Sequence, residues 1–399
     1  MEIKMGERNL DFDTVIERRH TKSLKYDFAV KRGKPADILP LWVADMDFRT
    51  SSYVEDALKK AAEHGIFGYT ETDEEYFDAV KVWMKSQYDW DITSERHLIK
   101  TPGIVFALAA AVNSYSEKGD PVLINSPVYY PFSEVINDNR RRVVSSNLVE
   151  TEDGSYTLDF EDFERKIVDN DIRLYFLCNP HNPGSKSWTR EELTKIGEIC
   201  VKHNVTVISD EIHADFEWDK KHIVFASLSP EISAITVTCT SPTKTFNIAG
   251  LQISNIIITD NKLRYRFRKQ VDAFGFSQAN AAGIYACEAA YKYGSEWLDA
   301  VKDYIQANID YTKDFIEKNL ENVRIFKPEA TYLIWLDFRG TGLSDEEIDR
   351  KIIHEAGLWL DSGSIFGDSG RGFQRINAAC PRSILQEALK RLVKAFKSA

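Results

Sequence analysis

The chain has 399 residues, 43% of them hydrophobic, and a formal net charge of -11. This length predicts two or three domains, and the composition is that of a folded globular protein, which argues against disorder. The acidic balance and the shortness of the basic clusters argue against nucleic acid or an anionic membrane as a partner.

The start of the chain is polar and lacks the apolar run of a secretory signal, and no stretch of about 18 apolar residues could span a membrane. The five cysteines stand far apart without a C-x-x-C pair, and the chain has no H-E-x-x-H motif. We therefore expect a cytoplasmic protein with neither a disulfide framework nor a metal site.

Residues 1–48 are predicted to form an N-terminal arm that belongs to a smaller domain. The arm ends in an apolar strip, residues 39–44, which contains Trp42. Such a strip needs a cover, and a partner subunit is one candidate.

Residues 49–288 are predicted to form a large α/β domain. Short apolar runs rich in β-branched residues are typical of strands buried on both faces of a mostly parallel sheet. These runs are 122–125, 172–178, 205–209, 235–240 and 254–259. Helices are expected between or beside them, at residues 104–116, 190–203 and 263–271.

Residues 289–399 are predicted to form a smaller α+β C-terminal domain. A helix is expected over residues 296–320, followed by strands at 323–326 and 331–337 and a final helix from residue 383.

Polar side chains follow three of the predicted strands. Asn182 lies in the segment after residues 172–178, Asp210 follows residues 205–209, and Lys244 lies shortly after residues 235–240. Open α/β sheets bind ligands at the carboxyl ends of their strands, so we expect these side chains to share one crevice.

Lys244 and Asp210 together indicate a pyridoxal phosphate cofactor. A buried amine forms an imine with the cofactor aldehyde, and a carboxylate keeps the pyridine nitrogen protonated so that the ring accepts electrons. Each residue alone has an ordinary interpretation, because most lysines extend into water and most such aspartates cap a helix or sit in a loop.

Two further features fit this cofactor. Gly103 precedes an apolar helix whose first N–H groups could hold a phosphate. Tyr129 and Tyr130 follow another strand and could stack on an aromatic ring, although core packing is equally compatible with them. No G-x-G-x-x-G or P-loop motif follows a predicted strand, which argues against nicotinamide dehydrogenases and P-loop enzymes.

Seven segments, spread in order over nearly the whole chain, carry a resemblance to one family. They are LWVADMDF (41–48), FGYT (67–70), SPVYYPF (126–132), CNPHNP (178–183), SDEIHADF (209–216), SPTKTFNIAGLQ (241–252) and RINAACPR (375–382). Together they resemble the MalY/PatB family of carbon–sulfur β-lyases, a branch of the fold-type I aminotransferases. The resemblance implies a fold-type I pyridoxal-phosphate transferase that acts on a small amino-acid substrate.

The resemblance also implies a role for each matching position in cofactor binding. Lys244 would hold the cofactor and then remove the Cα proton, and Asp210 would pair with the ring nitrogen. Asn182 would hydrogen-bond the phenolic oxygen, with His213 near the same oxygen in place of a more usual tyrosine. Tyr129 would stack on the ring. The phosphate would be held by Gly103, Ile104, Val105, Ser241 and, from the other subunit of a homodimer, Tyr69.

Arg375 would bind the substrate α-carboxylate, a task suited to its planar guanidinium. Trp42, Val43 and Ala44 would line the same pocket. Either Tyr130 or Lys244 would protonate the departing thiolate, and the sequence does not choose between them.

The implied reaction is β-elimination from cystathionine- or cysteine-type amino acids to give pyruvate, ammonia and a thiol. Gln252 favours a lyase, since many aminotransferases have an arginine there. An aminotransferase remains the alternative, because both reactions use the same residues at first. A binding protein that retains the fold is a third possibility, and the intact set of Lys244, Asp210, Asn182 and Arg375 argues against it.

Overall fold

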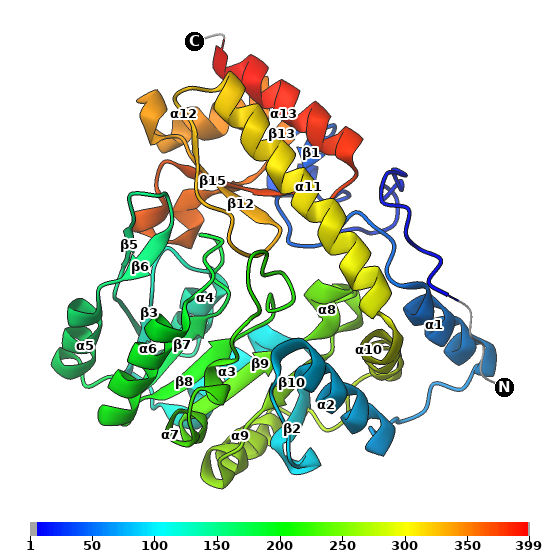
Figure 1. The fold of residues 1–399 in the computed structure, drawn as a ribbon, viewed down its shortest axis with the longest axis vertical. Coiled ribbons are helices and arrows are strands. Elements are labelled where there is room, and N and C mark those ends of the chain that lie inside the picture. The colour runs from blue at the N-terminus through cyan, green and yellow to red at the C-terminus, as the bar shows by residue number, and fades with distance from the viewer. Residues whose placement is uncertain (1–5, 398–399) are drawn as a thin grey trace.

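The computed structural model describes residues 6–397, and its centre is a seven-stranded sheet flanked by helices (Figure 1). The strand order is β2-β10-β9-β8-β7-β3-β4. The strands are β2 (Leu98–Thr101), β3 (Pro121–Ile124), β4 (Arg142–Ser145), β7 (Leu174–Cys178), β8 (Thr206–Asp210), β9 (Thr236–Thr240) and β10 (Ser254–Ile257). The prediction of a mostly parallel α/β sheet is confirmed, with β10 antiparallel to both of its neighbours.

Helices cover both faces of this sheet. The helices of this part of the chain are α1 (Ser52–His64), α2 (Glu74–Tyr88), α3 (Ile104–Tyr115), α4 (Pro131–Asp138), α5 (Phe160–Asp169), α6 (Arg190–Lys202), α7 (Pro230–Ala234), α8 (Pro242–Thr245), α9 (Asn261–Ala273) and α10 (Ala281–Tyr293), of which α1 packs against α10. One apolar core joins the sheet to α3, α4 and α9, and another joins it to α5 and α6. A small hairpin, β5 (Leu148–Glu150) and β6 (Tyr156–Leu158), follows β4. The central strands are therefore buried on both faces, as their continuous apolar runs predicted.

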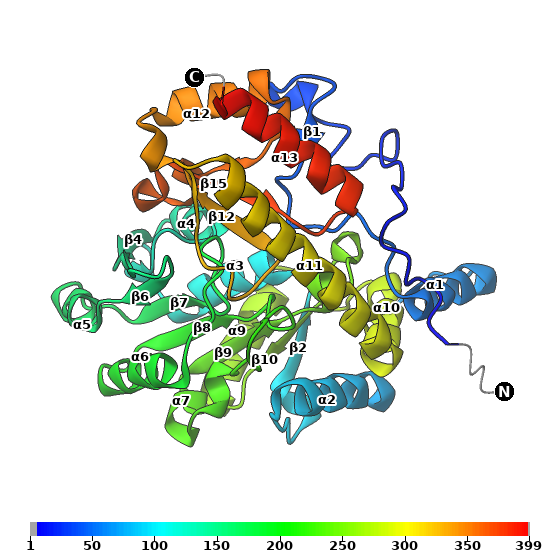
Figure 2. The same ribbon diagram turned by 45° about the horizontal axis from the view of Figure 1, so that its top comes forward.

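A second, antiparallel sheet lies above the first, in the order β11-β12-β15-β14. Its strands are β11 (Arg324–Ile325), β12 (Leu333–Asp337), β14 (Asp361–Ser362) and β15 (Phe373–Asn377). The helices beside it are α11 (Ser295–Asn319), α12 (Asp345–Arg350) and α13 (Arg382–Lys397), and α11 and α13 pack side by side (Figures 1 and 2). The expected α+β character of this region is present, while the domain limits at residues 48 and 288 stay a prediction.

The arm joins this upper region. Its strand β1 (Leu39–Pro40) pairs in parallel with β13 (Leu358–Trp359), and Trp42 stacks on Trp359 with ring centroids 4.4 Å apart. The C-terminal region of the same chain thus provides a strand and an aromatic ring that partly cover the apolar strip, while a partner subunit as a further cover stays a prediction.

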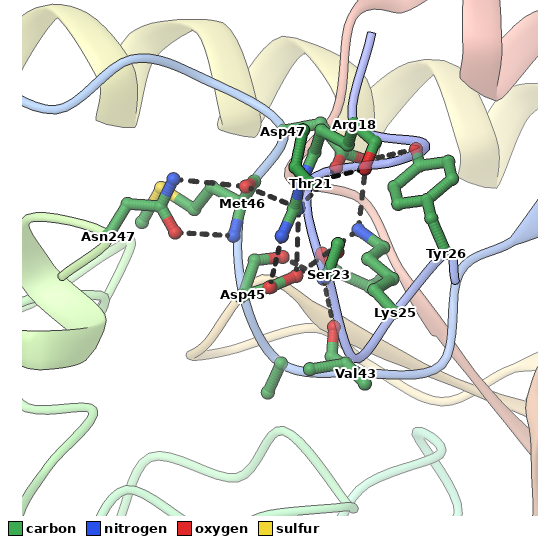
Figure 3. A network of polar contacts seen from close by, with 12 residues as sticks. Arg18, Thr21, Ser23, Lys25, Tyr26, Val43, Asp45, Met46, Asp47 and Asn247 are labelled. Atoms are coloured by element: carbon green, nitrogen blue, oxygen red, sulfur yellow. Dashed lines mark hydrogen bonds and ion pairs between the residues drawn. The ribbon is translucent and has the colours of Figure 1, made fainter. Parts of the chain in front are cut away.

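Charged side chains join two parts of the arm, residues 18–25 and residues 45–47 (Figure 3). Lys25 is fully buried, with its Nζ 2.9 Å from Asp47 and 3.5 Å from Asp45. Arg18 forms ion pairs with the same two carboxylates, at 2.7 Å from Asp45 and 2.6 Å from Asp47. We call Arg18, Lys25, Asp45 and Asp47 the arm quartet; its two cations and two anions balance one another, as buried charges require.

Among residues 6–397, none of the helices has the length and apolar character needed to cross a membrane. Cys178, Cys200, Cys239, Cys287 and Cys380 are all buried, and none of them forms a disulfide within the described residues.

Candidate active site

A cavity of about 300 Å³ lies where the carboxyl ends of β7 and β8, the start of α8, the arm and β15 meet. Twelve of the predicted site residues line it: Trp42, Val43, Ala44, Ile104, Val105, Tyr129, Tyr130, Asn182, Asp210, His213, Lys244 and Arg375. The expected convergence of the strand ends on one crevice is therefore present. Its cause is the parallel pairing of β7 with β8 and of β8 with β9, which places their last residues at one edge.

Three predicted residues do not line this cavity. Gly103 lies just before its wall at Ile104. Ser241 points into the protein, where its hydroxyl donates to the Ile253 carbonyl at 2.7 Å. Tyr69 is 99% exposed, so it contributes nothing to the pocket of its own chain.

Asp210 ends β8 as a buried carboxylate with one hydrogen bond, from the Ile212 N–H at 3.3 Å. Burial raises the pKa of Asp210 to about 7, and the single N–H bond offsets this only in part. A carboxylate in this position is stabilised by a cationic partner, which a protonated pyridine nitrogen provides.

The amine of Lys244 lies in the same cavity, on the short helix α8. Burial lowers the pKa of Lys244 to about 8, so a substantial fraction of the amine is neutral near physiological pH. Its Nζ donates to the Ala44 carbonyl at 2.5 Å, and the Tyr332 hydroxyl donates to the same carbonyl at 3.1 Å. The arm thus fixes the position of the nucleophilic nitrogen.

Asn182 and His213 flank these two groups. Burial lowers the pKa of His213 well below its usual value, so the ring is neutral, and its Nδ1 has no hydrogen-bond partner among the described residues. Asn182 accepts from Arg375 Nη1 at 2.8 Å through its Oδ1, which leaves its amide N–H groups for another acceptor.

Helix α3 begins at the cavity wall with Ile104 and Val105, and its N-cap, Gly103, provides no side-chain cap. The φ of Gly103 is 149°, a value that favours glycine. The first N–H groups of α3 are consequently available to an anion, the arrangement that helix N-termini offer to phosphates.

These donors and acceptors fit pyridoxal phosphate: a nucleophilic amine, an uncompensated carboxylate, neutral hydrogen-bonding groups and an uncapped helix N-terminus surround one cavity. Among residues 6–397, no cluster of three or more metal-binding side chains is found.

Several residues of this site were not predicted from the sequence. Leu24, Cys178, Ile212, Thr243, Ala249 and Asp361 also line the cavity. Most of them are sequence neighbours of residues that were found. Asp361 is different, because it lies on the two-residue strand β14, and no motif marks it.

The family profile described as "Aminotransferase class I and II" matches residues 36–392. Cystathionine beta-lyase PatB of Bacillus subtilis is 44% identical over 96% of this chain and 99% of its own length. Cystalysin from Treponema denticola, whose crystal structure contains pyridoxal 5'-phosphate, superposes with a TM-score of 0.93 at 40% identity over 97% of this chain and 99% of its own. A PLP-bound putative aminotransferase from Clostridium difficile 630 gives 0.94 at 41% identity, with the same coverage.

A mostly parallel seven-stranded sheet, with a buried lysine and carboxylate at its strand ends, defines the fold-type I class of pyridoxal-phosphate transferases. The chain belongs to the class I and II aminotransferase family and, within it, to the MalY/PatB branch.

Proposed function

We propose that this chain is a pyridoxal-phosphate-dependent carbon–sulfur β-lyase that releases a thiol, pyruvate and ammonia from cystathionine- or cysteine-type amino acids. One observation carries the proposal: the Lys244 amine, with its pKa lowered to about 8 by burial, shares a cavity with Asp210 and Arg375. Two similar proteins support it: PatB is named a cystathionine beta-lyase, and the crystal structure of cystalysin contains pyridoxal 5'-phosphate.

Lys244 would hold the cofactor through its amine, and the free amine would accept the Cα proton of the substrate. When bound, pyridoxal phosphate supplies the electron sink for the charge left at Cα. Asp210 would keep the ring nitrogen of the cofactor protonated, Asn182 and His213 would hydrogen-bond its phenolic oxygen, and Tyr129 would stack on its ring. Ile104 and Val105, with Gly103 before them, offer backbone N–H groups to the phosphate, and Ser241 lies nearby at the N-cap of α8.

The substrate is held by its α-carboxylate on Arg375, in the part of the pocket lined by Trp42, Val43 and Ala44. The departing thiolate needs a proton, and two donors lie in the same cavity. Tyr130 is one, because burial raises the pKa of its hydroxyl and keeps it protonated. Lys244, after it has accepted the Cα proton, is the other.

We further propose that the enzyme works as a homodimer in which Tyr69 completes the partner's phosphate site. Tyr69, Phe67 and Ile66 are strongly exposed. Ile66 and Phe67 line a surface cavity of about 450 Å³ together with Tyr285 and Tyr293 of α10. We place the enzyme in the cytoplasm, since five buried unpaired cysteines are typical of a reducing compartment.

The purified protein is incubated with L-cystathionine and, separately, with L-cysteine, without any 2-oxo acid, and pyruvate and thiol or sulfide are measured. Catalytic release is expected. Lys244→Ala should lower kcat by at least about 10²–10⁴-fold and abolish the borohydride-reducible yellow chromophore, whereas Lys262→Ala, at an exposed lysine of α9, should change neither. The same chromophore in Lys244→Ala would refute the proposal.

An aminotransferase is the second candidate, because the family profile and the solved Clostridium difficile protein carry that name. Its chemistry uses the same residues for proton removal. Activity that appears only after a 2-oxo acid is added would favour it over the lyase, and no turnover under either condition would favour a binding protein.

A further inference from the structure

The guanidinium of Arg375 has three partners from its own chain. Its Nη1 donates to Asn182 at 2.8 Å, and its Nη2 donates to the Trp42 carbonyl at 3.0 Å and forms an ion pair with Asp361. The Arg375 Nε–H is buried and has no partner among the described residues. Arg375 and Asp361 face one another across neighbouring strands, since they are paired in the register of β14 and β15.

These contacts leave no complete edge of the guanidinium for a substrate carboxylate. Arginine has five N–H donors, and a carboxylate binds two of them on one edge. One such edge presents the Nε–H and an Nη2–H, and the other presents an Nη1–H and an Nη2–H. Nη2 is therefore part of both edges. Because both Nη2 hydrogens already have acceptors, bidentate binding requires either the Trp42 carbonyl or Asp361 to move away.

Asp361 is the partner that can move. The backbone beside Trp42 is held by the Leu41 N–H bond to Trp359 at 2.9 Å and by the Asn377 bond to the Val43 carbonyl at 2.7 Å. The Asp361 carboxylate has Arg375 as its only hydrogen-bond partner among the described residues, and rotation of its side chain breaks no backbone bond.

We propose that Asp361 is a positioning residue that competes with the substrate α-carboxylate for Arg375 and takes up a proton when the substrate replaces it. This inference rests on the proposed function, because it assumes that Arg375 binds the α-carboxylate.

The proton uptake follows from the charges in the cavity. Two ionised carboxylates next to one buried guanidinium repel each other, and burial favours the neutral form of one of them. Around Asp361 the charged or titratable groups are Arg375 from β15, Lys34 from the arm and Tyr130 from the segment before α4. Burial raises the pKa of Asp361 although Arg375 and Lys34 oppose this, so Asp361 is the carboxylate that accepts the proton.

Calorimetry on the wild-type holoenzyme tests this without turnover. The probe is 3-(methylthio)propionate, which has the carboxylate and thioether of a substrate but no amine. Its binding is measured at pH 8 in two buffers that differ in ionisation enthalpy. About one proton taken up per site is expected, with a loss of affinity of up to about tenfold for each pH unit above the pKa of Asp361. Binding without proton uptake would overturn the proposal.

The variant Asp361→Asn removes the competing charge but keeps an acceptor for Arg375. It should bind the probe at least about tenfold more tightly at pH 8, with no proton uptake and no pH dependence between pH 6.5 and 8.5. Asp349→Asn is the matched control, because Asp349 is a partly buried carboxylate bonded to Gln374 that does not line the cavity. It should behave like the wild type.

Weaker binding by Asp361→Asn, or binding of the probe by neither protein, would overturn the proposal. Probe binding with proton uptake but no pyruvate from any amino acid would refute the lyase alone. Pyruvate formation without proton uptake would refute only the role of Asp361.

Discussion

Lys244 is partly buried, so its amine loses part of the water that normally surrounds a lysine and gains one strong acceptor, the Ala44 carbonyl. Burial is the larger effect on its pKa, and the nearby Asp45 and Asp210 oppose it in part, while Arg375 adds to it. The same burial leaves the amine close to neutrality and fixes its direction. Nucleophilicity and position are therefore set by one packing arrangement.

The pKa of about 8 makes a kinetic prediction for this residue. Only the neutral amine attacks an aldehyde, so attachment of pyridoxal phosphate to the cofactor-free protein should accelerate about tenfold between pH 7 and pH 9, with a midpoint near pH 8. The measurement is the rise of the yellow absorbance after mixing. A midpoint near pH 10, typical of exposed lysines, would contradict it, and Lys244→Ala provides the blank.

Strand ends made most of this site predictable. Lys244, Asp210 and Asn182 lie directly after apolar runs, and the geometry of parallel sheets brings such positions together. Asp361 and Tyr332 could not be found in this way. Asp361 reaches the cavity through a two-residue strand, and Tyr332 acts through the Ala44 carbonyl, so both depend on pairing between distant segments.

At the scale of elements, the arm is held by side chains from β15 and from the loop after α8. Asn377 donates to the carbonyls of Val43 and Asp45, both at 2.7 Å, and Asn247 bonds to the backbone of Met46 and Phe48. The arm quartet adds charge pairing to these bonds (Figure 3). The wall of the pocket is thus fixed by contacts that lie outside the pocket itself.

Lys25→Met should lower the free energy of unfolding by about 3–5 kcal/mol, because it removes a buried cation and leaves Asp45 and Asp47 to share Arg18 alone. Urea unfolding of the two proteins measures the difference. Arg49→Met is the control, since the Arg49 side chain is 57% exposed in its pair with Glu55, and a loss below about 1 kcal/mol is expected. Equal losses of unfolding free energy in Lys25→Met and Arg49→Met would show that the buried ion pairs of Lys25 stabilise the fold no more than an exposed pair does.

A second buried charge cluster lies behind β8. The His222 ring contacts Glu217 at 2.7 Å and Glu211 at 3.0 Å, and all three side chains are buried. Burial alone would lower the pKa of His222, but the two carboxylates outweigh it and raise this pKa to about 9. His222 therefore stays protonated in the folded protein at neutral pH.

This pKa predicts a pH-dependent contribution to stability. In the unfolded chain His222 loses its proton near pH ~6.5. Its contribution is complete below that pH and is lost as the pH rises through about 9. The difference in unfolding free energy between wild type and His222→Gln should fall by on the order of 3 kcal/mol from pH 6.5 to 9.5.

Chemical denaturation at several pH values measures this difference. His97→Gln serves as the control, since burial lowers the pKa of His97, so its contribution to stability should not fall as the pH rises. If the difference in unfolding free energy between wild type and His222→Gln does not change with pH, His222 is not the protonated group proposed here.

The elements themselves followed the sequence closely where apolar periodicity was strong. Helix α11 was expected over residues 296–320 and spans Ser295–Asn319, and β7 and β9 each lie within the runs that predicted them. The partners of β1 and β14 could not be predicted, because a two-residue strand has no periodicity, and its pairing is decided by tertiary packing.

At the scale of the whole molecule, a contiguous exposed apolar surface lies beside α1 and α10. Ile66 and Phe67 are each 74% exposed, more than a monomer normally leaves to solvent at adjacent positions. Tyr69 follows two residues later. A second copy of the chain that covers this surface would carry Tyr69 away from its own pocket and towards the partner's.

Mixing two inactive variants tests this arrangement. Lys244→Ala and Tyr69→Phe are unfolded together and refolded, so that about half of the dimers contain one subunit of each kind. In such a dimer the site with Lys244 receives Tyr69 from the other subunit, and the second site is inactive. About a quarter of wild-type activity should therefore return. Each variant refolded alone is the control and should stay far below this level. Absence of complementation would contradict a site shared between subunits.

The pairing of β1 with β13 also bears on synthesis of the chain. The apolar strip around Trp42 is synthesised first, and the central sheet with Lys244 follows. The strip therefore stays exposed until β13 and Trp359, which pack against it, leave the ribosome. A product truncated before residue 358 would retain the amine yet expose an unpaired strand edge, the feature that templates aggregation. Loss of the C-terminal region should therefore yield an insoluble protein, not a smaller active one.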